Sequence, residues 1–400
     1  MGFLRRIADR FDPQTEQRAA DPSWAALSGH HGDFTSLLTS GQVGGAIPPH
    51  LAENLSTVLA CVNAVSGAIS SLPVWFYNIS GEGRSIDKDF PLARLVREGP
   101  NQHQSWPEFI EGVTAQLLLN GNALVEIKTQ ARSGEVIELI PHAWTGVAVR
   151  LLPSGRLAYD ITPVSSVYGS TGETRRLLDS DVLHLRDRSD DGLVGRSRLS
   201  RASGPVRTGL TQETFGEILY ANRGTPSGLI SVSENLSDMH WKRIQDGVEQ
   251  SWRGVRNAGR VFVLEGGAKY TPITVSPESL EMLATRRFST EEVARLFGVP
   301  PPIVGIWDHS TFTNSETAGR WFAQFTLAPI IRKIEEAFRR SVFTAEARRT
   351  HEMEIDLSGF LRGDAETRWR NHEIAARNGI LTTDEIRESE GWAPRREVRM

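Results

Sequence analysis

The stretch RLFGVPPPIVGIWDHST, residues 295–311, combines a helix end, three consecutive prolines and a tip with tryptophan and histidine. Gly298 predicts the end of the preceding helix, because glycine adopts the left-handed conformation that closes many helices. The prolines at 300–302 fix φ and remove backbone donors, so the helix cannot continue through them. Gly305 allows a sharp change of direction before a new helix begins at Thr313. We expect a stiff bracket with a mobile tip between two helices.

The spacing of apolar residues predicts helices on both sides of this bracket. A helix over 197–222 is interrupted by Gly204 and Pro205, and another over 276–297 breaks at Phe288 and restarts with a Ser289 cap. The long helix after Thr313 should bend at Pro329. The predicted apolar face of that helix consists of Trp321, Phe322, Phe325, Ile330, Ile331, Ile334 and Phe338.

The segment 226–275 reads as a compact insert between the first two of these helices. It is predicted to hold a helix around 237–252, a strand over 260–265, a glycine turn and a return strand over 269–275. Five arginines lie in the neighbouring helical segment, at positions 196, 198, 201, 207 and 223, and only two glutamates accompany them.

The N-terminal half mixes helices and strands. A helix over 52–71 should bury Leu55, Leu59, Val62 and Ile69, and a strand follows over 74–79. A helix over 106–119 precedes a hairpin over 121–142, and short strands follow over 146–187. The tail adds a strand over 351–357 and helices over 364–377 and 383–390. The fold class is α+β.

Composition limits the classes of function. The 400 residues are 39% hydrophobic and carry a formal net charge of −4, which excludes a generally basic surface. The single cysteine, Cys61, cannot form an intrachain disulfide and is expected in the core. The apolar tract over 55–76 is interrupted by polar residues and Pro73, so we expect a buried helix and no membrane contact.

Catalytic and ligand motifs are incomplete throughout the sequence. GGAKY at 266–270 lacks the spacing of a phosphate loop, and HEMEI at 351–355 lacks the second histidine of a zinc helix. GRSRL at 195–199 is not a nucleophile elbow, and the acidic 189–191 reads as a solvated turn. His184 is expected to be structural. We predict no catalytic residue, no cofactor and no metal.

In chain order, many stretches resemble the portal proteins of tailed bacteriophages, the HK97-like portal family. The resemblance covers about 50–394. The matching stretches are STVLACVNAVSGAISSLPVWFY (56–77), FPLARLV with PN (90–101), FIEGVTAQLLLNGNALVEI (109–127), DVLHLRDRSDDGLVGRSRLSRA (181–202), ANRGTPSGLIS (221–231), NAGRVFVLEGGAKYTPI (257–273), RRFSTEEVARLFGVPPPIVG (286–305), STFTNSE (310–316) and GILTTDEIRESEGWAP (379–394).

The resemblance implies a virion protein that assembles into a ring, usually a dodecamer, at one capsid vertex. Double-stranded DNA would pass through the ring during packaging and ejection, without sequence readout. The implied partners are the terminase large subunit, which supplies the ATP-driven motor, the major capsid protein and scaffold, and a head-tail adaptor. The protein would lie in the host cytoplasm during assembly.

The resemblance also implies a portal fold with a wing, a two-helix stem, a small α/β clip and a helical crown. The expected boundaries are a flexible arm (1–48), wing (49–195), first stem helix (196–225), clip (226–275), second stem helix (276–297), tunnel loop (298–313), long kinked helix (314–343), return strand to the wing (344–360) and crown (361–400).

Three sets of candidate site residues follow from this assignment. The channel-facing loop tip would comprise Gly305, Ile306, Trp307, Asp308, His309, Ser310 and Thr311, although Trp307 could instead pack on a neighbouring subunit. The stem arginines Arg196, Arg198, Arg201 and Arg207 could face DNA or, as we favour, bridge to acids of the next subunit. The clip candidates for partner docking are Lys242, Arg243, Arg253 and Arg256, although a helix with so many charges could equally be ordinary solvated surface.

The charge balance fits a conduit, because a strongly basic channel would hold DNA instead of letting it slide. Two other interpretations stay open at this point. One is a non-enzymatic α+β scaffold or binding module of lower oligomeric state. The other is a hydrolase that uses His184 and nearby acids.

Overall fold

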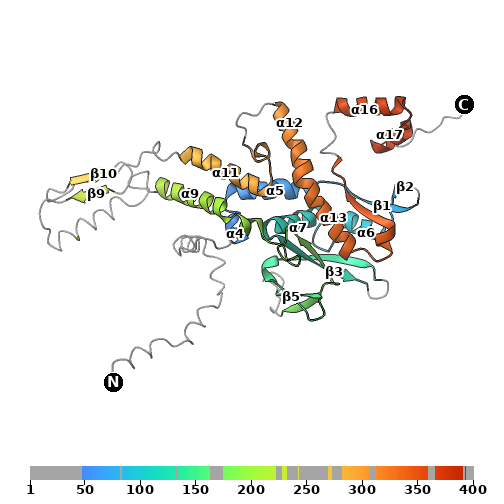
Figure 1. Ribbon diagram of the computed structural model, residues 1–400, viewed down its shortest axis with the longest axis horizontal. Coiled ribbons are helices and arrows are strands. Elements are labelled where there is room, and N and C mark those ends of the chain that lie inside the picture. The colour runs from blue at the N-terminus through green and yellow to red at the C-terminus, as the bar shows by residue number, and fades with distance from the viewer. Residues whose placement is uncertain are drawn as a thin grey trace, which may run out of the picture. The chain divides into compact units, whose positions relative to one another are not determined.

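Mixed helices and antiparallel strands make up the computed structural model, whose elements are labelled along the chain in Figure 1. It describes residues 47–81, 83–130, 134–162, 174–221, 228–231, 242, 269–272, 282–306, 312–358, 365–390 and 392. The predicted α+β class is therefore confirmed. The predicted arm over 1–48 lies outside the described residues, except for 47 and 48. Among the described residues, no helix is long and apolar enough to cross a membrane.

Two helices that pack against one another supply many of the buried hydrophobic side chains. After the short α4 (Pro49–Ala52), α5 (Ser56–Ser70) packs against α7 (Trp106–Asn120). The buried stripe of α5 includes Val58, Cys61, Val62, Val65 and Ile69. The prediction for Leu59 was wrong, because that side chain is 43% exposed. It lies about 100° around the helix axis from Val58, which is outside the stripe.

The helix α7 has a clear signal at each end. Ser105 and Glu108 form a capping box, in which the Ser105 amide donates to the Glu108 carboxylate over 2.7 Å. Gly121 closes the helix with a φ of +73°. A side chain at Gly121 would also collide with the backbone at Arg196 and Ser197, only 2.6 Å from its Cβ position. This glycine therefore allows two distant segments to touch.

Next to α7 lies a three-stranded antiparallel sheet in the order β4-β3-β8. The predicted hairpin is confirmed as β3 (Asn122–Thr129) and β4 (Val136–His142), with Val125 opposite Pro141. The strand β8 (Val182–Arg186) pairs with the other edge of β3. The helix α13 (Ala328–Ser341) packs against β8.

Two further sheets complete the N-terminal half. Strands β5 (Val147–Leu151), β6 (Leu157–Ile161) and β7 (Arg175–Leu178) pair in sequence order after the short helix η3 (Trp144–Gly146). In the other sheet, β1 (Val74–Gly81) lies between β2 (Gly83–Ile86) and β11 (His351–Ile355). The helices α6 (Pro91–Glu98) and α14 (Ala347–Thr350) both contact β1.

The two helices before the bracket lie against one another as α9 (Ser203–Ala221) and α11 (Met282–Phe297). The break before α9 falls at Ala202, after the short α8 (Arg198–Arg201), and not at Gly204 and Pro205. Proline is tolerated in a first helical turn, which is where Pro205 lies.

The predicted break at Phe288 was wrong, because α11 runs through it without interruption. Ser289 is buried, and its hydroxyl lies 3.2 Å from the position that a Cβ on Gly209 would occupy. Its role is therefore to pack against α9, and it does not begin a helix.

Only part of the predicted insert lies among the described residues. The return strand is present as β10 (Lys269–Pro272), and it pairs with β9 (Gly228–Ser231), which the sequence did not indicate. Lys242 is helical, in agreement with a helix around 237–252. The rest of that helix and the strand over 260–265 lie outside the described residues.

The long helix is continuous but irregular. It consists of α12 (Phe312–Trp321), a π-helical stretch η8 (Phe322–Leu327) and α13. Pro329 has no amide to donate to the Phe325 carbonyl four residues earlier, so a wider turn at this point has a local cause. The predicted apolar face was wrong at Trp321 and Phe325, which are 60% and 66% exposed. The tail helices are α16 (Ala365–Arg377) and α17 (Thr383–Ser389), within two residues of prediction.

Candidate functional site

The predicted bracket begins with a complete helix stop. Gly298 has a φ of +73°, its amide donates to the Arg295 carbonyl over 3.1 Å, and the Val299 amide donates to the Ala294 carbonyl over 2.9 Å. These two hydrogen bonds form a Schellman motif. The Thr326 hydroxyl of the long helix donates to the Gly298 carbonyl. The end of α11 is thereby fixed to the helix that follows the bracket.

The proline stretch forms a short 3₁₀ helix, η7 (Pro301–Val304), which ends at Gly305 with a φ of +84°. The Ile306 amide donates back to the Pro301 carbonyl over 3.1 Å. The bracket is thus ordered through Ile306, with Gly305 exposed and Ile306 half-buried. Residues 307–311, the rest of the predicted tip, lie outside the described residues.

A half-buried carboxylate holds the base of the bracket. Asp187 follows β8 and accepts a hydrogen bond from Arg198 Nε over 2.8 Å and one from Lys333 Nζ of α13 over 2.5 Å. A second nitrogen of Arg198 donates to the Phe297 carbonyl, at the end of α11, over 2.9 Å. Asp187 and Arg198 therefore connect the central sheet, the bracket and the long helix.

The charges around Asp187 decide its ionisation. Burial raises the pKa of this carboxyl, but Arg198 and Lys333 outweigh that effect and lower the pKa to about 2. Asp187 is an anion at neutral pH, with its charge paired on two sides. The arrangement is that of a structural anchor.

Two more of the candidate arginines are paired within the chain. Asp190 accepts from Arg201 over 2.7 Å and from Arg196 over 3.2 Å, and hydrogen bonds with Arg201 and then Arg196 lower its pKa. Asp191 accepts from the amides of Val194 and Leu193, which lower its pKa to about 2. The acidic stretch 189–191 is thus a turn, as predicted.

The remaining candidates are dispersed. Arg207 lies half-buried on α9, and Lys242 is exposed. Arg243, Arg253 and Arg256 lie outside the described residues. The structure brings Arg196, Arg198 and Arg201 together around Asp187 and Asp190, and it does not place Arg207 or Lys242 in that group.

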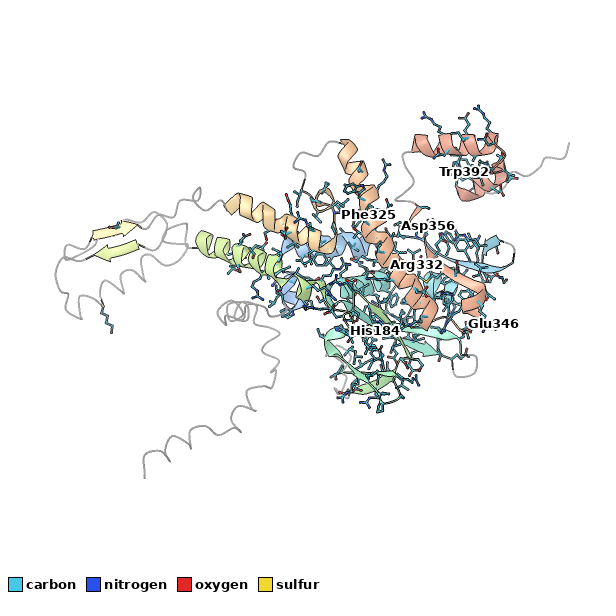
Figure 2. The ribbon with its side chains drawn as sticks, in the orientation of Figure 1. His184, Phe325, Arg332, Glu346, Asp356 and Trp392 are labelled. Carbon is cyan, nitrogen blue, oxygen red and sulfur yellow. The ribbon has the colours of Figure 1, made fainter. Side chains whose placement is uncertain are left out.

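His184 belongs to a buried network that does not resemble a catalytic site. One ring nitrogen lies 3.0 Å from the Asn122 side-chain oxygen, the other lies 3.1 Å from the Tyr159 hydroxyl, and the ring stacks on Trp144. Burial, followed by the charges of Arg186 and Arg340, lowers its pKa to about 3. The imidazole is neutral, and neither ring partner is an acid, so the contacts of His184, which is labelled in Figure 2, give no support to the hydrolase interpretation.

Sequence reasoning missed Asn122. Its side chain donates to the Gly195 carbonyl and accepts from the Gly195 amide, each over 2.7 Å. A Cβ on Gly195 would lie 2.0 Å from the Gly121 carbonyl oxygen. The sequence signal was the pair of distant glycines, because such close backbone contact excludes any side chain. This crossing fixes the start of α8 to the end of α7.

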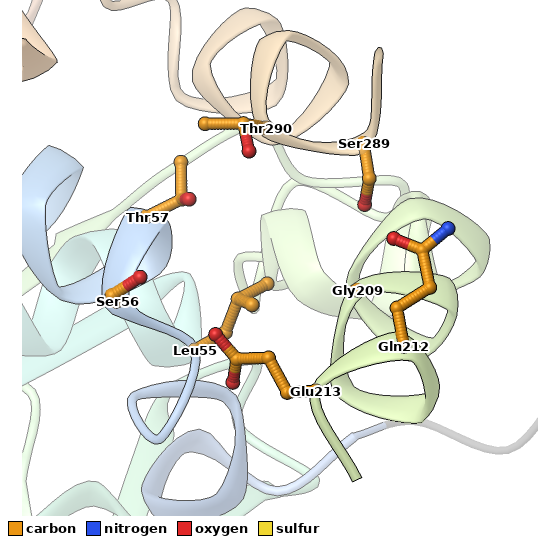
Figure 3. Close-up of a pocket in the computed structure, with 8 residues that line it drawn as sticks. All are labelled: Leu55, Ser56, Thr57, Gly209, Gln212, Glu213, Ser289 and Thr290. Atoms are coloured by element: carbon orange, nitrogen blue, oxygen red, sulfur yellow. The ribbon is translucent and has the colours of Figure 1, made fainter. Parts of the chain in front are cut away.

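A small polar hollow lies where α5, α9 and α11 meet (Figure 3). It is lined by Leu55, Ser56, Thr57, Gly209, Gln212, Glu213, Ser289 and Thr290. Across the described part of the chain, no group of three or more histidine, cysteine or acidic side chains is placed to hold a metal ion.

A protein-family model described as phage portal protein matches residues 56–391. The chain belongs to the phage portal protein family. The portal protein of Enterobacteria phage HK97 is 29% identical over 345 residues, which are 85% of this chain and 79% of that protein.

Solved structures agree with the portal fold. A crystal structure of an HK97 family phage portal protein from Corynebacterium diphtheriae has a TM-score of 0.57 at 18% identity, covering 78% of this chain and 95% of that one. A chain in the neck of a native gene transfer agent particle, computed with C12 symmetry, has a TM-score of 0.56 at 23% identity, covering 90% and 98%. The predicted family and portal fold are confirmed, and this portal protein is a structural component of the virion at the capsid vertex.

Proposed function

We propose that this portal protein forms a dodecameric ring whose central channel passes double-stranded DNA during packaging and ejection. The C12 symmetry of the related neck supports the subunit number. We propose the same boundaries for the wing, stem, clip and crown as the sequence predicts, and a ring that itself carries out no catalysis.

The observation that carries the channel assignment is the anchored bracket over 298–306. Its first carbonyl is bound by Thr326, and the preceding carbonyl, of Phe297, is bound by Arg198. A loop that borders a moving duplex must hold its position without binding the duplex tightly, and ordered backbone with few charges meets both needs. Residues 305–311 are the proposed channel-facing tip.

The intrachain pairs support an anchoring role for Arg196, Arg198 and Arg201. Arg207 remains our candidate for a contact with the channel or with the next subunit. The terminase large subunit and later the head-tail adaptor would dock on the clip, through Lys242, Arg243, Arg253 and Arg256. The major capsid protein and scaffold would contact the outside of the ring.

Negative-stain microscopy of the purified full chain tests this proposal. We expect annular particles with an axial hole, and light scattering that gives a mass of about twelve chains. A stable monomer under all assembly conditions, including added scaffold, would favour a binding module of lower oligomeric state. ATP hydrolysis by the purified chain would contradict a separate terminase motor.

A further inference from the structure

Two large aromatic side chains on the long helix are exposed. Trp321 and Phe325 are 60% and 66% exposed, and their rings meet edge to face with centroids 6.4 Å apart. Other side chains of the same helix pack into the core, since Phe322, Leu327 and Ile334 are buried. The exposed pair therefore lies away from the buried side of the helix, and Figure 2 labels Phe325 on it.

The exposed residues form a short stripe. Trp321, Phe325 and Pro329 follow one another at intervals of four residues and are all exposed. Polar groups border them, namely Gln324 and the Arg332 side chain, which is 78% exposed. An aromatic centre with a polar border is the composition of the few residues that dominate protein–protein interfaces.

We propose that Trp321 and Phe325 anchor each chain to a second copy of itself in the ring. This inference rests on the proposed ring, in which every subunit contacts its two neighbours through two different surfaces. The chemistry favours a protein surface over the DNA in the channel, because a duplex backbone presents phosphate anions, and two uncharged aromatic rings with a single indole N–H donor between them offer those anions little. Burial against a neighbour removes both rings from water.

A double substitution tests the anchor. Trp321→Ser with Phe325→Ser removes both rings, and Leu151→Ser is the matched control, because Leu151 is 59% exposed but lies on β5. Sedimentation velocity should find rings for the unchanged chain and the control, and folded monomers for the double variant, with assembly at least tenfold weaker. The circular dichroism spectrum and Tm of the monomer should not change, since both rings are exposed in the single chain.

A crosslinking experiment identifies the partner directly. Phe325 is replaced by the photocrosslinker p-benzoylphenylalanine, and the irradiated rings are analysed by gel electrophoresis and peptide mass spectrometry. We expect covalent dimers and higher ladders, with a peptide of a second copy attached at position 325. Crosslinks confined to one chain would overturn the inference and assign the cover to another part of the same polypeptide.

The outcomes separate this inference from the proposed function. Rings formed equally well by the double variant would overturn the anchor and leave the ring intact. Equal loss of assembly in the Leu151→Ser control would also overturn it, because the effect would then not be specific to the helix. Failure of the unchanged chain to form rings would instead reject the proposed function, and the anchor with it.

Discussion

Replacing Asp187 with asparagine should weaken the whole junction at the base of the bracket. The substitution keeps the size of the side chain but removes the charge that Arg198 and Lys333 share. The pKa of Asp187 is lowered from 3.8 to about 2, a difference that corresponds to about 2.5 kcal/mol of stability at neutral pH. The Asp187 side chain is only 10% exposed, so solvent screens this energy little.

The pH dependence has a definite sign. The pKa of Asp187 is lower in the folded chain than in the unfolded chain, so its stabilisation is complete well above pH 3.8 and is lost as the pH falls towards 2. The difference in unfolding free energy between the unchanged chain and Asp187→Asn should be about 2.5 kcal/mol at pH 7. It should fall to about half of that at pH 3.

Urea unfolding followed by tryptophan fluorescence measures this difference. The control is Asp179→Asn, which removes an exposed pair in which Arg156 and Asp179 lie 2.6 Å apart. We expect the control to change the unfolding free energy by less than about 0.5 kcal/mol. The reasoning is refuted if Asp187→Asn is as stable as the control, or if its deficit is the same at pH 3 and pH 7.

Three further predictions concern the crossing, the buried histidine and the tip. Gly195→Ala should prevent folding or destabilise the chain by at least about 3 kcal/mol in thermal unfolding, because its Cβ meets backbone at 2.0 Å, whereas Gly112→Ala on α7 has open space and should be neutral or stabilising. His184 should show no imidazole titration by NMR between pH 5 and 8, because burial lowers its pKa from 6.5 to about 3. Since the unfolded chain takes up this proton first, the buried histidine should reduce the stability of the fold as the pH drops from 6.5 towards 3. Titration near pH 6.5 would contradict the buried network. Deleting residues 305–311 should leave rings intact in electron micrographs but reduce DNA retention in packaging assays, and loss of assembly would make the tip an interface.

Local signals explain most of the agreement between sequence and structure. The Gly298 stop and the left-handed Gly305 each depend on residues within one or two turns, so a single sequence contains all the information needed. The proline bracket was predicted for the same reason, since the restriction of φ belongs to the residue itself.

The failures have non-local causes. Ser289 looked like a helix start because its neighbours fit a capping box, but contact with Gly209 on another helix decides its role. Trp321 and Phe325 were assigned to the core by their hydrophobicity, which does not tell whether a side chain is covered by its own chain. Asp187, Asn122 and Lys333 were missed as anchors because their partners are far away in sequence.

The pairing of β1 with β11 has a consequence for the order in which the chain can fold during synthesis. Arg84 of β2, the strand next to β1, binds Glu354 of β11, although the two residues are 270 positions apart. Until the ribosome has released β11, one edge of β1 has no strand to pair with, and such an open edge can pair with another nascent chain. The sheet thus closes only after the helices as far as α14 and the bracket have been made, so premature termination before residue 351 leaves a product with an unpaired strand edge that can aggregate.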